Sequence, residues 1–265
     1  MRPSINNINR KHFIEMTGKT IALSVLSPAT LITIAAKPSI KAVAFDAFTL
    51  FDTSTVLAKA EILYPGKGAE LMTLWRNRQF EYTWLRSLSK KYKDFWNVTA
   101  DALVFAAASL KLTLSNENKD QLMQSILQMK FLPGAGKVLR QLKDMSLQLA
   151  ILSNATPAML QAVINNSAMK GVFDFVISTD AVKTYKPDPA AYQLGINAFK
   201  VQKEEILFVA FGGWDAAGAK SFGFPTAWIN AAGVPAEQLD ALPDYTCKNL
   251  SELVGYIKSI IKSQY

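Results

Sequence analysis

Short apolar runs alternate with amphipathic stretches over most of this chain. Runs of aliphatic and β-branched residues bounded by polar residues are typical of buried parallel strands, and they occur at 41–45, 147–153, 173–178, 205–210 and 226–230. Apolar residues recur at helical spacing over 134–145, 157–168, 189–199, 215–222 and 251–262. This alternation implies right-handed crossovers between parallel strands. The sequence therefore predicts an α/β fold built on a doubly wound parallel sheet.

The alternation is interrupted after the first strand by a long helical stretch. Four helices are expected in it, with no strand among them, at 54–63, 68–92, 94–112 and 116–129. Leu71, Trp75 and Tyr82 fall on one helical stripe, which indicates a packed core rather than a cofactor site. We expect a helical cap of residues 54–130, inserted into a sheet domain of residues 38–53 and 131–265.

Polar side chains stand where several predicted strands end. These are Asp46, the Ser153–Asn154 pair, Lys186 and Asp215. In open α/β sheets the ligand site lies beyond the carboxyl ends of the strands, so these groups are expected to converge on one active site. The two aspartates have a plainer alternative, because a strand-end aspartate often caps a loop or a helix. Asp215 in particular could cap the helix that follows it.

Composition narrows the chemistry. Half of the 265 residues are hydrophobic, which excludes a disordered chain. The only histidine is His12, near the N-terminus, so His-dependent nucleophilic catalysis and His-ligated zinc are not available to the body of the chain. Any acid–base catalysis must then use carboxylates, lysine or tyrosine. The single cysteine, Cys247, cannot form an intramolecular disulfide and leaves the redox compartment open.

The formal net charge is +8, and part of it belongs to the first 36 residues. These carry four basic residues and one acidic residue, which leaves 25 basic and 20 acidic residues, or +5, for the remainder. The basic residues are scattered along amphipathic helices. A nucleic-acid partner is therefore not expected, whereas a modest positive field suits small anionic substrates.

Residues 1–36 are built like an export signal. A polar, basic segment to Lys19 precedes an apolar segment from Ile21 to Ala36, in the order of a secretory signal peptide. Residues 9–14 resemble the twin-arginine export motif, with lysine in place of the second arginine. We expect an exported, periplasmic protein with no membrane span after cleavage; an uncleaved anchor and a cytoplasmic protein are the alternatives.

The strand-end residues appear in a recognisable order, with a helical insertion after the first of them. Asp46, Ser153-Asn154, Lys186-Pro187-Asp188 and Trp214-Asp215 together resemble the haloacid dehalogenase (HAD) superfamily. Longer segments at 66–76, 79–88, 94–103 and 218–225 look like one branch of it, the L-2-haloacid dehalogenases of type II. The resemblance to that branch implies a HAD-like core with a helical cap, and an active site that needs no cofactor and no metal. The sequence leaves the oligomeric state open, and a homodimer is one alternative.

Phe48 agrees with this branch on chemical grounds. HAD phosphatases usually carry a second aspartate at this position, as the acid that protonates an alcohol leaving group. A halide leaves without a proton, so an aromatic ring suffices there and a carboxylic acid would only add a desolvation cost. The aspartate that is absent is also one of the usual magnesium contacts of those phosphatases.

The resemblance implies a covalent mechanism for short 2-haloalkanoic acids. Asp46 would attack C2 and expel halide, and water would then hydrolyse the aspartyl ester to a 2-hydroxy acid. Lys186 would hold Asp46 ionised, and Asp215 would orient Lys186 and activate water. By the same resemblance Arg76 would bind the halide, and the pair Ser153 and Asn154 would bind the substrate carboxylate and position the nucleophile. Tyr192 and Thr49 would lie nearby, and Phe48, Phe80 and Trp214 would form an apolar wall.

Two loops depart from the family pattern. Relatives usually have a glycine before the threonine that follows the nucleophile, and here Thr49 comes one residue early. Where many relatives have serine and asparagine that help to hold water, this chain has Ala210 and Gly212. Two alternatives therefore stay open, a HAD phosphatase with altered acid catalysis and a binding protein on the same scaffold that has lost turnover.

Overall fold

A computed structural model describes residues 39–262, so the expected export signal at 1–36 lies outside the described residues. Within this part of the chain a six-stranded sheet forms in the order β5-β4-β1-β6-β7-β8, and every neighbouring pair is parallel. The strands are β1 (Ala42–Phe45), β4 (Gln148–Ser153), β5 (Phe175–Ser178), β6 (Ile206–Ala210), β7 (Thr226–Ile229) and β8 (Tyr245–Cys247). The predicted doubly wound parallel sheet is confirmed.

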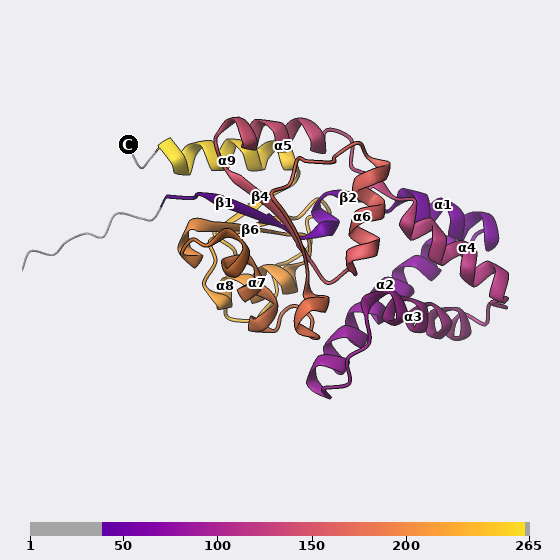
Figure 1. Cartoon of the computed structure of the whole chain (residues 1–265). Helices are drawn as coiled ribbons and strands as arrows, with labels where there is room; N and C mark the ends of the chain where they lie inside the picture. Colours follow the sequence, from indigo (N-terminus) through magenta and orange to yellow (C-terminus); the bar gives the residue numbers. More distant parts are fainter. Residues whose placement is uncertain (1–38, 263–265) are drawn as a thin grey trace, which may run out of the picture. The chain divides into compact units, whose positions relative to one another are not determined.

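Helices cover both faces of the sheet (Figure 1). On one face lie α5 (Ala135–Asp144), α6 (Pro157–Asn166) and α9 (Leu250–Lys262), and on the other α7 (Pro189–Phe199) and α8 (Gly213–Phe222). Successive strand residues point to opposite faces. Accordingly Val43 and Phe45 join one apolar cluster, whereas Ala42 and Ala44 join the other. Burial on both faces explains why the strands have continuous apolar sequences.

The register sets the position of the site. Phe45 is level with Ile151 of β4 on one side and with Val209 of β6 on the other. The next residue, Asp46, therefore emerges at the same edge as the ends of both neighbours. The chain leaves β1 toward β4 and leaves β6 in the opposite direction, toward β7, so β1 and β6 flank a topological switch point, where ligands bind in such folds.

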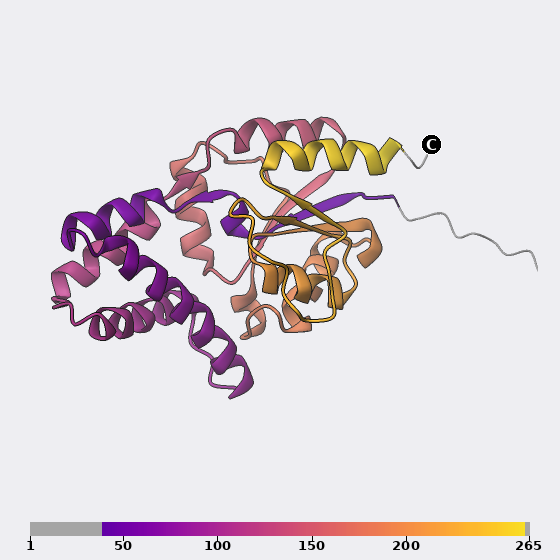
Figure 2. The same cartoon turned by 180° about the vertical axis from the view of Figure 1, so that it is seen from behind.

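The helical stretch consists of α1 (Ser54–Leu63), α2 (Gly68–Leu88), α3 (Phe95–Ser109) and α4 (Asn116–Leu127). All four expected helices are present, but α2 and α3 end earlier than predicted. After each of them a lysine adopts a left-handed conformation, Lys90 at φ 54° and Lys111 at φ 56°, which ends the helix. In both views the four helices lie beyond the end of the sheet at which β1 finishes (Figure 2).

Two short strands that the sequence did not predict connect this stretch to the sheet. β2 (Phe51–Asp52), just before α1, pairs antiparallel with β3 (Lys130–Phe131), just after α4. The Phe51 and Phe131 rings meet edge to face at 5.3 Å. The described residues belong to one compact unit, so the division into a core and a cap stays a prediction. Within residues 39–262 no helix combines the length and the apolar character needed to cross a membrane.

Candidate active site

The carboxylate of Asp46 lies directly after β1, at the start of a short 3-10 helix, Ala47–Thr49. Its Oδ1 accepts a hydrogen bond from the backbone N–H of Phe48 at 2.8 Å, and its Oδ2 accepts one from Lys186 Nζ at 2.7 Å. The residue is only 7% exposed. Two donors thus fix an almost buried carboxylate at the sheet edge.

The ammonium of Lys186 is fully buried between two carboxylates. Its Nζ lies 2.7 Å from Asp46 Oδ2 and 2.6 Å from Asp215 Oδ2, and 4.9 Å from the centre of the Phe208 ring. Burial by itself would lower the pKa of Lys186, but the charges of Asp215 and Asp46 outweigh it and raise this pKa. Lys186 is therefore a permanent cation at physiological pH.

Asp215 lies in the first turn of α8, whose N-cap residue is Gly212. The capping alternative is wrong, because the side chain of Asp215 bonds to Lys186 and, through Oδ1, accepts the hydroxyl of Tyr192 at 2.7 Å. Burial raises the pKa of Asp215 to about 6, against the lowering effect of Lys186. Tyr192 is buried, and burial and Asp215 raise its pKa as well, so its phenol stays a neutral donor.

Ser153 and Asn154 end β4 and complete the same edge. Asn154 Oδ1 accepts hydrogen bonds from the backbone N–H of Lys186 at 2.9 Å and from the hydroxyl of Thr179 at 3.3 Å. Its Nδ2 is buried and has no hydrogen-bond partner among the described residues. Ser153 Oγ accepts the backbone N–H of Ala155 at 3.1 Å. An unpaired amide donor in a buried site is costly unless a ligand accepts from it.

Thr49 is buried, and its hydroxyl donates to the backbone carbonyl of Asp46 at 2.6 Å. The hydroxyl stabilises the turn after Asp46 rather than the carboxylate itself. The loop forms the 3-10 helix Ala47–Thr49.

The aromatic wall expected from Phe48, Phe80 and Trp214 is present. The Phe80 ring lies 6.3 Å from Phe48 and 5.3 Å from Trp214, measured between ring centres. Two further rings complete it and were missed, Trp84 at 5.4 Å from Trp214 and Phe211 at 5.9 Å from Phe48. Trp84 could have been found, because it follows Phe80 by four residues on the same face of α2.

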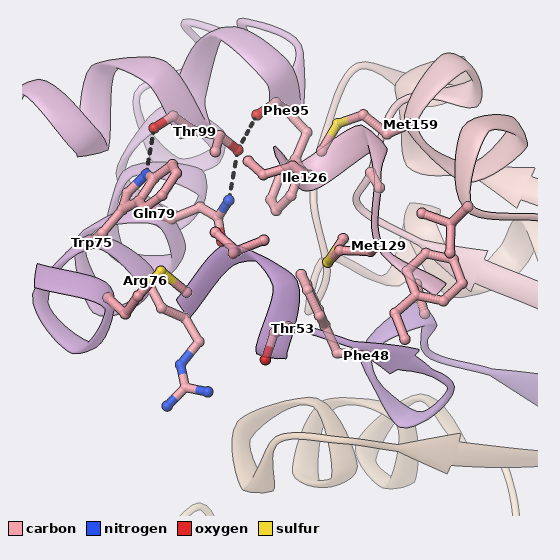
Figure 3. Close-up of a pocket in the computed structure, with 16 residues that line it drawn as sticks. Phe48, Thr53, Trp75, Arg76, Gln79, Phe95, Thr99, Ile126, Met129 and Met159 are labelled. Atoms are coloured by element: carbon pink, nitrogen blue, oxygen red, sulfur yellow. Dashed lines mark hydrogen bonds between the residues drawn. The ribbon is translucent and has the colours of Figure 1, made fainter. Parts of the chain in front are cut away.

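Arg76 is the one predicted residue that the structure does not bring into contact with this cluster. It is exposed on α2, and within residues 39–262 its guanidinium has no hydrogen bond or ion pair. It lines a pocket together with Phe48, and its side chain points away from the hydrogen-bonded group of Trp75, Gln79 and Thr99 (Figure 3). Its contact with a leaving halide stays a prediction.

The buried groups can carry out two kinds of chemistry. The Asp46 carboxylate has the chemistry of a nucleophile, and the hydrogen-bonded Lys186, Asp215 and Tyr192 side chains beside it have groups that can hold or pass on a proton. In the part of the chain that the structure covers, no cluster of three or more His, Cys, Asp or Glu side chains could hold a metal ion.

Comparisons with known proteins agree with this arrangement. The family model of haloacid dehalogenase-like hydrolases matches residues 40–223. An (S)-2-haloacid dehalogenase of Pseudomonas sp. (strain YL) is 40% identical over 81% of this chain and 93% of its own length. A solved L-2-haloacid dehalogenase is 47% identical with a TM-score of 0.82, over 83% of this chain and all of the other. A Xanthobacter autotrophicus L-2-haloacid dehalogenase, solved with chloropropionic acid covalently bound, is 35% identical with a TM-score of 0.75, over 83% of this chain and 98% of its own. This chain therefore belongs to the haloacid dehalogenase-like hydrolase family, and its relatives include (S)-2-haloacid dehalogenases.

Proposed function

We propose that this protein is a hydrolase that removes halide from short 2-haloalkanoic acids and releases 2-hydroxy acids. The observation that carries the proposal is the buried Asp46–Lys186–Asp215 group, in a chain 40% identical to an (S)-2-haloacid dehalogenase. The chloropropionic acid bound covalently in the Xanthobacter relative supports a covalent intermediate here.

In the first step, an oxygen of the Asp46 carboxylate attacks C2 of the substrate from the side opposite the halogen. A C–O bond forms, the C–X bond breaks, and the halide leaves with the bonding pair. Nδ2 of Asn154, which is unpaired, and the hydroxyl of Ser153 bind the substrate carboxylate. The rings of Phe48, Phe80 and Trp214 keep water away from the C–X bond, and Arg76 receives the halide.

In the second step, water attacks the carbonyl carbon of the Asp46 ester, and the acyl C–O bond to the substrate oxygen breaks. The 2-hydroxy acid leaves with the proton that Asp215 took from the water, and the Asp46 carboxylate is restored. Asp215 accepts the proton of that water, and Lys186 keeps Asp215 oriented. In the free protein the negative charge of Asp46 raises the pKa of Asp215, and esterification removes that charge. The pKa of Asp215 therefore falls once the ester has formed, and the group is ionised when it is needed as a base.

The test is halide release from L-2-chloropropionate and L-2-bromopropionate by protein beginning at Lys37. We expect turnover in EDTA, D-lactate as the co-product, and at least about a thousandfold loss of kcat in Asp46→Asn. In a single turnover in ¹⁸O-water, the label should enter Asp46 and not the lactate. Magnesium-dependent phosphate release without halide release would contradict the proposal. A single burst of halide would mean that the ester forms but is not hydrolysed.

Export to the periplasm is a second proposal, which rests on the sequence of residues 1–36 alone. The expected mature protein begins near Lys37, and the mass of protein recovered from a periplasmic fraction would reveal that start. Full-length protein in the cytoplasm would contradict export. The homodimer stays a prediction.

A further inference from the structure

An apolar pocket lies between α2 and α3 on one side and α6 on the other (Figure 3), and its lining includes Ala47 and Phe48, the two residues after Asp46. Its walls are built largely from flexible and aromatic apolar side chains, among them Met72, Trp75, Phe95, Met129, Met159 and Val163. Methionine adapts to ligands of different shape, because its side chain is unbranched and polarizable.

Three polar side chains of this wall, Trp75, Gln79 and Thr99, form hydrogen bonds within the protein. Gln79 Nε2 donates to Thr99 Oγ1 at 2.6 Å, and Thr99 Oγ1 donates to the backbone carbonyl of Phe95, also at 2.6 Å (Figure 3). The indole N–H of Trp75 donates to the backbone carbonyl of Thr99 at 2.7 Å. These side chains therefore have few donors left for a polar ligand, and the pocket suits an apolar one.

Two loops that carry active-site residues also contribute to the lining of the pocket. Ala47 and Phe48, which line it, directly follow Asp46, and the N–H of Phe48 holds the Asp46 carboxylate. Ala155, which also lines it, directly follows Asn154. The only charged side chain in the lining is Arg76. A carboxylic acid bound at Asp46 would thus have its charge near the sheet edge and an apolar space beside C2.

From this geometry we infer that the pocket binds the alkyl chain on C2, and that the enzyme prefers 2-haloacids with chains longer than that of 2-halopropionate. This inference rests on the proposed function, because the pocket takes its meaning from a substrate whose C2 lies at Asp46. The ligand class is an amphiphilic monocarboxylate, such as a 2-halohexanoate.

The size of the preference follows from burial of the chain. Each buried methylene is worth about fourfold in affinity, so a butyl group in place of a methyl group is worth up to about 60-fold. We expect kcat/KM for L-2-bromohexanoate to exceed that for L-2-bromopropionate by about 10- to 60-fold. Unhalogenated hexanoate should likewise inhibit more tightly than propanoate.

Two adjacent residues of α2 provide the matched variants. Met72 lines the pocket, whereas the side chain of Thr73 is exposed and its hydroxyl bonds only to the carbonyl of Ala69 in the same helix. Met72→Phe should reduce the preference for bromohexanoate over bromopropionate to about onefold. Thr73→Phe introduces the same ring outside the pocket and should keep the wild-type ratio.

The outcomes separate the pocket from the activity. A bromohexanoate preference that Met72→Phe removes and Thr73→Phe keeps would support the inference, and equal or lower kcat/KM for bromohexanoate in the wild type would overturn it. If neither substrate releases halide, the proposed function fails, and the binding of unhalogenated hexanoate and propanoate then tests whether the pocket takes an alkyl chain. Hexanoate that raises Tm more than propanoate, in the wild type but not in Met72→Phe, would then support a pocket for alkyl chains. Equal effects of the two acids would overturn it.

Discussion

The Lys186 ammonium has no exposed surface, and it balances two buried carboxylates, Asp46 and Asp215. In Lys186→Met both carboxylates would lose their cation while remaining buried. Breaking a buried pair in this way costs about 3–5 kcal/mol, because an uncompensated charge is left behind. We expect the free energy of unfolding, measured in urea at neutral pH, to fall by that amount.

Lys220→Met is the matched control for this prediction. Lys220 pairs with Asp244 at 2.6 Å, but these side chains are 35% and 27% exposed, so the loss should stay below about 1 kcal/mol. Equal losses in the two variants would show that burial of the Lys186 group does not matter to stability.

Asp215 should give the reaction an acid limb. Its pKa is raised to about 6 by burial, and only the ionised carboxylate can accept a proton from water. We expect the rate of ester hydrolysis, seen in the pH profile of kcat, to fall at acid pH, at a pH below the free-protein value of about 6 because the ester has removed the charge of Asp46. A kcat profile with no fall at acid pH would remove Asp215 from this role.

The raised pKa of Asp215 also affects stability, but here low pH is favourable, whereas it slows the reaction. Because the folded pKa of Asp215 lies above its unfolded value, the folded state binds this proton more tightly, and the stabilisation is lost as the pH rises through about 6. In Asp215→Asn this contribution to the pH dependence of the unfolding free energy should be absent.

Among the elements, α8 approaches the segment after Lys186 unusually closely. A Cβ on Gly218 would lie 2.6 Å from Pro187 Cβ and 2.6 Å from the Tyr192 hydroxyl. Gly218→Ala should therefore push α8 away, weaken the bond between Tyr192 and Asp215, and lower the free energy of unfolding by about 1–3 kcal/mol. Urea unfolding and kcat would both record the change.

Gly255→Ala in α9 is the corresponding control, since a Cβ there meets nothing within 4 Å. Alanine in an open helix interior should stabilise by about 0.5–1 kcal/mol. A Gly218→Ala protein as stable and active as the wild type would mean that α8 adjusts without affecting the site.

The elements that the sequence predicted best are those with a clear pattern of apolar residues. The strands beside β1 have continuous apolar runs because helices cover both their faces, and the apolar pattern alone locates them. β8, Tyr245–Cys247, was not predicted, because a three-residue edge strand leaves no such run. The ends of α2 and α3 depend on left-handed lysines, which have no sequence signature as clear as that of glycine.

At the scale of the whole molecule, the meeting of Asp46, Lys186 and Asp215 was predictable because parallel strands end at one edge. The details beyond that edge were not. Trp84 could be predicted from its spacing to Phe80, but its contact with Trp214 depends on where α2 lies. Phe211 joins the aromatic wall through its contact with Phe48, which no local pattern encodes. The exposed position of Arg76 likewise depends on how α2 is placed, not on its own sequence.

The ladder of β2 and β3 has an evolutionary consequence. Asp52 is paired with Lys130, so the chain leaves for the four helices and returns from them at neighbouring points. Those helices therefore form a cassette that can be lengthened, exchanged or reshaped without disturbing the strand that carries Asp46. Since the cassette supplies Met72, Trp75 and Phe95 to the pocket, selection could change the shape of the pocket while Asp46, Lys186 and Asp215 are inherited unchanged.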